Sequence, residues 1–266
     1  MGKYLGVERV AFNIAGYDVY WYGVVISLSI IIAIAVAMLL CKFKKYPIDM
    51  PVNIAIVILP TGILGARLFA VLFDSSLNLN EFFNFRTGGM SILGAVVFGG
   101  FGLLVYCLIK KEKNLYKYFD VLAVVLLLAQ AIGRWGNYFN SEVYGQIVAP
   151  DSQLAFFPFV VNIDGVLYQA LFFYEFVLNL IGFAVLVAIF MKTKRNGFVT
   201  IFYLIFYGMI RIVLESFRQP QYVLKMFGLP VSQIVSGLMI AFGVILLVLI
   251  VIKKENQNSK IKGVKK

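Results

Sequence analysis

Residues 121–145 read VLAVVLLLAQAIGRWGNYFNSEVYG, and this stretch decides the fold class. Its first part, Val121–Leu128, is a continuous apolar run of the kind that lies in a lipid bilayer. Four polar or charged side chains follow close together: Arg134, Asn137, Asn140 and Glu142. Because ionisable groups at membrane depth cost much free energy, this cluster indicates a functional site.

The composition is that of an integral membrane protein. Apolar residues make up 61% of the 266 positions, against about 45–50% in soluble globular domains. The chain contains no histidine, so imidazole plays no part in its chemistry, and we expect no metal and no cofactor. We predict one polytopic membrane domain over residues 1–252 and a basic cytoplasmic tail, polar and disordered, over residues 253–266.

Seven apolar stretches have the length that a bilayer-spanning helix needs. They predict an all-α membrane protein with seven transmembrane helices at about Val19–Leu40, Val52–Phe73, Gly88–Ile109, Phe119–Phe139, Leu171–Met191, Phe198–Phe217 and Val231–Ile252.

The basic residues indicate the orientation of these helices. Most of the 24 Lys and Arg residues lie in clusters between or after the spans, at Lys42–Lys45, Lys110–Lys117, Lys192–Arg195 and from Lys253 onward. A net charge of +11 could suit nucleic acid, but clusters in this arrangement are typical of cytoplasmic membrane loops. We therefore expect a lipid bilayer and no nucleic acid as partner, with the N-terminus outside and the C-terminus in the cytoplasm.

Three segments on the outer side are not simple spans. Residues 140–170 carry turn-forming residues such as Pro150, Pro158 and Gly165 around a short apolar run, which predicts a small extracytoplasmic lobe that is β-rich or irregular. Residues 1–18 are predicted to form an interfacial segment. Residues 75–85 are predicted to form a second, shorter outer element.

Charged side chains within the spans collect near the outer side. One stripe of the sixth span carries Tyr207, Arg211, Glu215 and Arg218 at helical spacing. Arg67 lies among small residues that permit close helix approach. Each of these groups could be a structural ion pair or an interfacial anchor, and Tyr22 suits an aromatic belt. Arginines converging on one cavity would instead form a receptor for an anion such as phosphate, because guanidinium offers a planar fork of donors.

Together these motifs resemble one family, the bacterial prolipoprotein diacylglyceryl transferases. The resemblance covers nearly the whole chain and rests on motifs in the same order and spacing: Tyr22-Gly23, Gly65-Ala66-Arg67, Gly88-Gly89-Met90-Ser91, the segment GRWGNYFNSE at 133–142, Tyr174-Glu175, and Arg211 with Glu215 and the segment FRQP at 217–220.

The resemblance implies a seven-helix plasma-membrane enzyme. Such an enzyme transfers the diacylglyceryl group of phosphatidylglycerol to the lipobox cysteine thiol of a prolipoprotein and releases glycerol 1-phosphate. It implies Arg134, Arg211, Tyr22 and Glu142 as catalytic residues. The substrate-binding residues would be Arg134, Asn137, Asn140, Gly145, Tyr207, Arg67, Gly89 and Ser91.

The chain departs from the family pattern at two histidines. Leu93 stands where the Gly-Gly-Met-Ser segment of the family continues to a functional histidine, and the family's His-Pro before the fifth span is replaced by Gln169-Ala170-Leu171. Two routes to activation of the thiol stay open. Clustered arginines would favour the thiolate and stabilise the leaving phosphate, or Glu142 would take the proton. The alternative function is a repurposed relative that binds anionic phospholipid or lipoprotein precursors.

Overall fold

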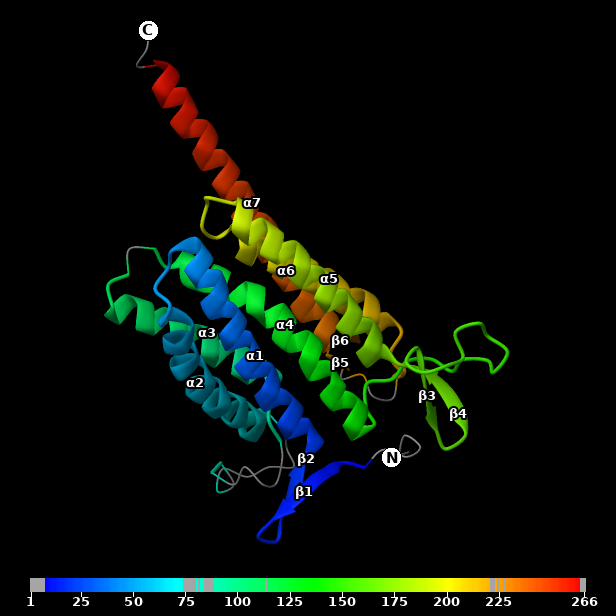
Figure 1. Cartoon of the computed structure of the whole chain (residues 1–266). Helices are drawn as coiled ribbons and strands as arrows, with labels where there is room; N and C mark the ends of the chain where they lie inside the picture. Colours follow the sequence, from blue (N-terminus) through cyan, green and yellow to red (C-terminus); the bar gives the residue numbers. More distant parts are fainter. Residues whose placement is uncertain are drawn as a thin grey trace. The chain divides into compact units, whose positions relative to one another are not determined.

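The computed structural model describes residues 8–73, 80, 82–83, 89–112, 114–220, 223, 225–226 and 228–263. Within these ranges it has seven helices that are long and apolar enough to cross a membrane (Figure 1). They are α1 (Trp21–Lys44), α2 (Met50–Phe73), α3 (Ile92–Ile109), α4 (Tyr116–Asn140), α5 (Leu171–Lys192), α6 (Phe198–Ser216) and α7 (Val231–Gly263). The predicted class, an all-α integral membrane protein with seven spans, is confirmed.

Two helix boundaries differ from the prediction. Helix α3 begins at Ile92 rather than Gly88, because Ser91 is the N-cap and its hydroxyl accepts a hydrogen bond from the amide of Gly94 at 3.5 Å. Helix α7 continues to Gly263, although we predicted a disordered tail from Lys253. The added residues are mostly Lys, Glu and Gln, which favour helix even without an apolar face.

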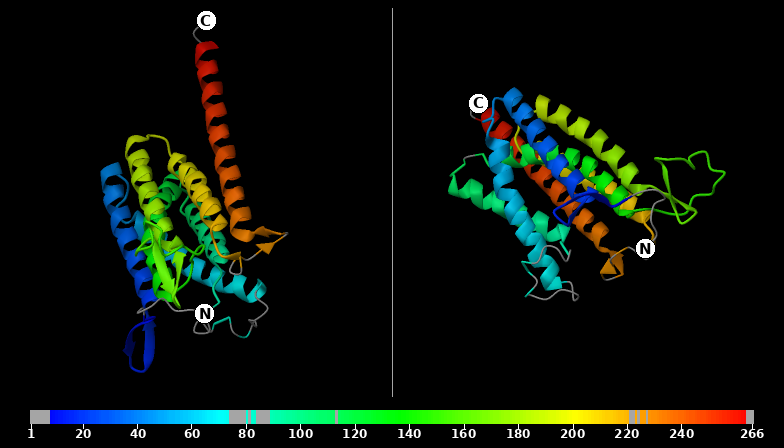
Figure 2. Two further views of the ribbon diagram at one scale, coloured as in Figure 1. Left: turned by 90° about the vertical axis from the view of Figure 1, so that its right-hand side faces the viewer. Right: turned by 60° about the horizontal axis from the view of Figure 1, so that its bottom comes forward.

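Three antiparallel hairpins lie outside the helices: β1 (Val10–Ile14) with β2 (Tyr17–Tyr20) before α1, β3 (Val160–Ile163) with β4 (Val166–Gln169) between α4 and α5, and β5 (Lys225–Met226) with β6 (Leu229–Pro230) between α6 and α7. Figure 2 shows the last of these directly before α7. The β3–β4 hairpin confirms a β-containing element in the 140–170 segment. The N-terminal segment is also a hairpin, and most of the outer element predicted at 75–85 lies outside the described residues.

The tight turns of two hairpins follow from local sequence. Ala15 and Gly16 have φ of 51° and 83°, and Asp164 and Gly165 have φ of 51° and 87°. A two-residue turn with both φ values positive matches the twist of paired strands and favours Gly at its second position. In each turn an asparagine, Asn13 or Asn162, accepts a hydrogen bond from the glycine amide at 2.9 Å.

The chain divides into two compact units. One comprises residues 1–35 and 123–266, and the other comprises residues 36–122. In the second unit, α2 and α3 approach closely where Gly65 faces Gly94. A Cβ atom at Gly94 would lie under 3.0 Å from the carbonyl of Gly65. This contact confirms the close helix approach predicted for the small residues around Gly65.

The first unit is organised around α4, α5 and α6. These helices meet at Gly182 of α5, where a Cβ atom would lie under 3.0 Å from both Leu127 of α4 and Phe206 of α6. Toward the β3–β4 hairpin, a buried cluster of Tyr144, Val161, Ile163, Ala170 and Phe172 packs on Trp135. The hairpin segment is therefore fastened to the ends of α4 and α5 that carry the polar motifs.

The α2–α3 contact can be tested by adding one methyl group. We expect Gly94→Ala to lower the free energy of unfolding by about 1–3 kcal/mol, because the backbone of Gly65 must move away. Gly100→Ala is the matched control on the same helix, since no atom of the described residues outside the local helix backbone lies within 4 Å of the added Cβ. Thermal unfolding of both variants in the same detergent measures the difference. Equal melting temperatures would contradict the close contact.

Candidate functional site

The centre of the site is the carboxylate of Glu175 on α5. Its side chain is only 1% exposed and contacts two arginines from different helices. Nη2 of Arg134 on α4 donates to Oε1 at 2.5 Å, and Nη1 of Arg211 on α6 donates to Oε2 at 3.0 Å. A carboxylate this deeply buried needs both partners to offset its desolvation. Glu175 therefore joins three helices at one point.

The ion pairs continue along α6. Nη2 of Arg211 donates to Glu215 at 3.1 Å, and Nη1 of Arg218 lies 3.6 Å from the other oxygen of Glu215. The predicted stripe on the sixth helix is thus a chain of alternating charges, with the i,i+4 pair expected from its spacing. Among these direct ion pairs, three arginines share two glutamates.

A second branch leads from Arg134 to the end of α4. Because α4 extends to Asn140, Arg134 and Asn137 share a helix face, as predicted. Nη1 of Arg134 donates to the Asn137 side-chain oxygen at 3.1 Å, and the amide groups of Asn137 and Asn140 donate to Oε1 of Glu142 at 2.8 and 3.3 Å. The structure therefore brings these four predicted residues into one hydrogen-bonded group.

A left-handed turn places Glu142 against this helix end. Ser141 and Val143 both have positive φ, 54° and 60°, a conformation that costs free energy for side chains other than glycine. The turn folds the chain back, and the amide of Glu142 donates to the carbonyl of Asn137 at 3.1 Å. The backbone strain is thus compensated by satisfied helix-end carbonyls.

Two tyrosines continue the polar surface along α6. Tyr207 is hydrogen bonded to Arg134 and lies within electrostatic reach of Arg211 and Glu175. Its ring stacks on Tyr203 with centroids 5.7 Å apart and planes 5° apart. The Tyr203 hydroxyl accepts a hydrogen bond from Gln130 of α4 at 3.1 Å. Polar contacts between α4 and α6 therefore extend one turn beyond the ion pairs.

The N-terminal hairpin and α1 support the end of α4. The ring of Tyr22 lies against Gly136, where a Cβ atom would approach to 2.8 Å, and Trp21 stacks on Phe139 at 5.2 Å. Nη2 of Arg9 donates to the carbonyl of Asn140 at 3.0 Å. Tyr22, predicted as catalytic, thus lies beside the Arg134 group and within reach of the charges of Arg134 and Glu142.

Gly145 follows this group and connects it to the β3–β4 hairpin. Its amide donates to the carbonyl of Gln169 at 2.8 Å, and its own carbonyl accepts from the side chain of Gln219 at 2.9 Å. A Cβ atom would come within 2.7 Å of Gln169 and 3.1 Å of Leu171. Close packing alone thus explains a glycine at this position.

The three remaining predicted residues, Arg67, Gly89 and Ser91, lie in the second unit. Arg67 on α2 is fully buried and donates to the carbonyls of Gly89 at 2.9 Å and Phe82 at 3.2 Å. The amide of Ser91 donates to the carbonyl of Ala66 at 3.0 Å. Arg67 therefore holds the segment that leads into α3, where Leu93 occupies the second position.

Two residues of the site were given no functional role from the sequence. Glu175 is the central carboxylate, although the sequence analysis only noted it beside Tyr174 as part of a motif shared with the family. A further signal was that it is the only charged residue within the span 171–191. Arg9 gave no signal, because its contact with Asn140 depends on folding the N-terminal hairpin back onto α4.

The role of Glu175 can be tested through stability. We expect Glu175→Gln to lower the free energy of unfolding by about 3 kcal/mol, because two partly buried guanidinium groups lose their shared counter-charge. Glu112→Gln makes the same change in a more exposed pair: Oε2 of Glu112 lies 3.1 Å from Nζ of Lys117, and the Glu112 side chain is 27% exposed. This substitution should cost less than about 1 kcal/mol. Unfolding in detergent compares the two. Equal losses would contradict a central role for Glu175.

Comparisons with known proteins place the chain among related sequences. Residues 9–249 match the family model described as prolipoprotein diacylglyceryl transferase. A phosphatidylglycerol–prolipoprotein diacylglyceryl transferase of Clostridium botulinum (strain Langeland) is 36% identical, covering 94% of this chain and 100% of the relative. A protein of the same name from Finegoldia magna is 37% identical, covering 90% of this chain and 94% of the relative. The chain therefore belongs to the prolipoprotein diacylglyceryl transferase family.

Proposed function

We propose that this protein transfers the diacylglyceryl group of phosphatidylglycerol to the lipobox cysteine thiol of prolipoproteins. The observation that carries the proposal is the Arg134–Glu175–Arg211 network within a chain that matches this family over most of its length. Its partners are a phospholipid, the signal peptide of a precursor and the bilayer. The protein lies in the bacterial plasma membrane with its N-terminus outside and its basic tail in the cytoplasm, as the basic clusters favour.

Arg134 and Arg211 bind the phosphate of the lipid in this proposal. Their side chains are 18% and 17% exposed, so neither arginine is fully enclosed, while Glu175 fixes the position of both. Donors held before the ligand arrives lose little freedom on binding, which favours both affinity and rate. Tyr207, beside Arg134, adds a hydroxyl to the same surface.

In the reaction, a carbon–sulfur bond replaces a carbon–oxygen bond at one glyceryl carbon of the lipid. The cysteine sulfur attacks the glyceryl carbon that carries the phosphate ester, a C–S bond forms, and the C–O bond breaks. The electron pair leaves with the oxygen of glycerol 1-phosphate. The two arginines stabilise the charge on the departing phosphate, which is the contribution that positioned cations make to phosphate chemistry.

Glu142 accepts the proton of the thiol in this scheme. Its carboxylate accepts hydrogen bonds from the side-chain amides of Asn137 and Asn140, which hold it at the end of α4 beside the Arg134 group. Tyr22 and Gly145 complete the surroundings of this group. Arg67, Gly89 and Ser91 act in substrate binding in their own unit, where Arg67 holds the Gly89 segment.

The function is tested by release of glycerol phosphate from phosphatidylglycerol in the presence of a lipobox peptide. We expect wild-type activity, and a loss of at least about 100-fold in Arg134→Lys and Arg211→Lys, because a lysine cannot bridge Glu175 and a phosphate with a planar fork. Lys110→Ala, in a basic cluster between spans, is the control and should be silent. A well-folded wild-type protein without activity would refute the transferase and favour a lipid-binding relative.

The proton acceptor is tested by the pH profile of Glu142→Gln. We expect this variant to lose about 100-fold in rate at neutral pH, the usual contribution of a general base. The loss should shrink as the pH rises through about 8.5, because the thiol then ionises without help. A deficit that stays constant with pH would show that Glu142 only orients Asn137 and Asn140.

A further inference from the structure

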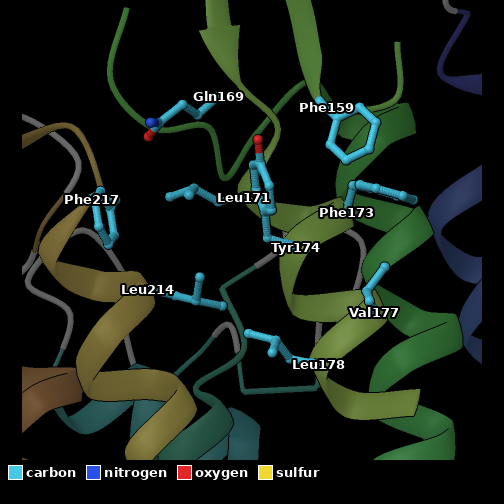
Figure 3. A pocket seen from close by; sticks show the side chains of 9 residues that line it. All are labelled: Phe159, Gln169, Leu171, Phe173, Tyr174, Val177, Leu178, Leu214 and Phe217. Atoms are coloured by element: carbon cyan, nitrogen blue, oxygen red, sulfur yellow. The ribbon is translucent and has the colours of Figure 1, made fainter. Parts of the chain in front are cut away.

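An apolar pocket of about 400 Å³ lies beside the ion network (Figure 3). Its walls come from the outer half of α5, the end of α6 and the β3–β4 segment, and include Tyr174, Leu178, Leu214, Phe217, Phe159 and Gln169. The volume falls within the range of about 300–1,000 Å³ that is usual for small-molecule sites. Phe217, at the rim, is 43% exposed, so the pocket is open to its surroundings.

Part of the pocket wall follows α5 (Figure 3). Leu171, the first residue of this helix, lines the pocket next to Phe159 and Gln169 of the β3–β4 segment, and Leu178 lies about 10 Å further along the helix at 1.5 Å per residue. Because α5 is a candidate membrane span, this row of side chains lies along the direction of lipid chains.

The pocket and the ion network use the same turns of the same helices. Tyr174, in the pocket wall, directly precedes Glu175, and Leu214 directly precedes Glu215. All of these residues belong to one compact unit. A phospholipid with its phosphate at Arg211 therefore has an apolar cavity within the reach of its chains.

The chemistry of the walls distinguishes an acyl chain from a peptide. The backbone amide and carbonyl of Gln169 are already bonded to Gln146 and Gly145, and its side-chain oxygen accepts from the amide of Gln146 at 3.3 Å. The other polar side-chain atoms in the walls are the amide nitrogen of Gln169 and the hydroxyl of Tyr174, and the remaining lining side chains are apolar. A buried peptide needs a partner for each backbone N–H and C=O group, and these walls do not supply them. An acyl chain has no such need.

We propose that this pocket holds an acyl chain of the phospholipid donor and makes the enzyme sensitive to chain length. The inference rests on the proposed function, since it assumes a phosphate bound at the arginines. The chain moves from one apolar medium, the bilayer, into another, so removal of methylene groups from water contributes little. The preference comes instead from fit: a chain that reaches Leu178 fills the pocket, whereas a shorter chain leaves part of it empty and loses those contacts.

The test narrows the deep end of the pocket with Leu178→Trp. Donors are phosphatidylglycerols with octanoyl, myristoyl or palmitoyl chains, and the lipobox peptide is kept constant. We expect kcat/KM for the palmitoyl donor to fall at least about tenfold relative to the octanoyl donor, because the indole ring occupies the space that the end of a long chain needs. Ile181→Trp is the matched control, because Ile181 lies on the same helix, 53% exposed and outside the pocket. This variant should keep the wild-type preference, and both should keep the wild-type melting temperature.

A labelling experiment separates failure of the pocket from failure of the proposed function. Phosphatidylglycerol with a photoreactive diazirine near the end of one acyl chain should label the α5 peptide containing Leu178 in the wild type and not in Leu178→Trp. Labelling without any glycerol phosphate release would uphold the pocket and refute the transferase. Activity that falls equally for all donors, a raised KM for the peptide alone, or labelling only outside the pocket would overturn the inference.

Discussion

The constraint on which the first unit depends is the burial of one carboxylate between two arginines from different helices. Glu175 is 1% exposed, and its two oxygens face Arg134 and Arg211. An unpaired charge at this depth would cost several kcal/mol. The bundle can therefore bury Glu175 only if α4 and α6 lie at fixed positions beside α5. Because each guanidinium group binds a different oxygen of Glu175, this contact also fixes the separation and the orientation of the two arginines.

Packing and polar contacts support each other around this point. Gly182 lets Leu127 and Phe206 approach α5 two turns beyond Glu175, while the Tyr203–Tyr207 stack and Gln130 fill the space between. At the other end, the left-handed turn at Ser141 carries Glu142 back to Asn137. Electrostatics thus selects which faces meet, and close packing decides how near they come.

Sequence reasoning was most successful where the physics is local. Apolar length predicted all seven spans, helical spacing predicted the Arg134–Asn137 and Arg211–Glu215 contacts, and turn-forming residues predicted a β-containing lobe. It was wrong about the start of α3 and about the tail, because a single cap residue and weak helix propensity decide those ends. It gave Glu175 no site role and passed over Arg9, because their partners lie 41 and 131 positions away in the chain.

By itself, the sequence determined that this is a seven-span membrane protein with no histidine and with a cluster of arginine, asparagine and glutamate side chains after one apolar run. Hydrophobic length and residue identity suffice for those conclusions. Only the tertiary structure decided that Glu175 is the shared partner of two arginines, that Tyr22 lies on Gly136, and that an apolar pocket follows α5 beside the charges. These facts depend on which helix faces meet, and desolvation and packing settle that only when the whole bundle has formed.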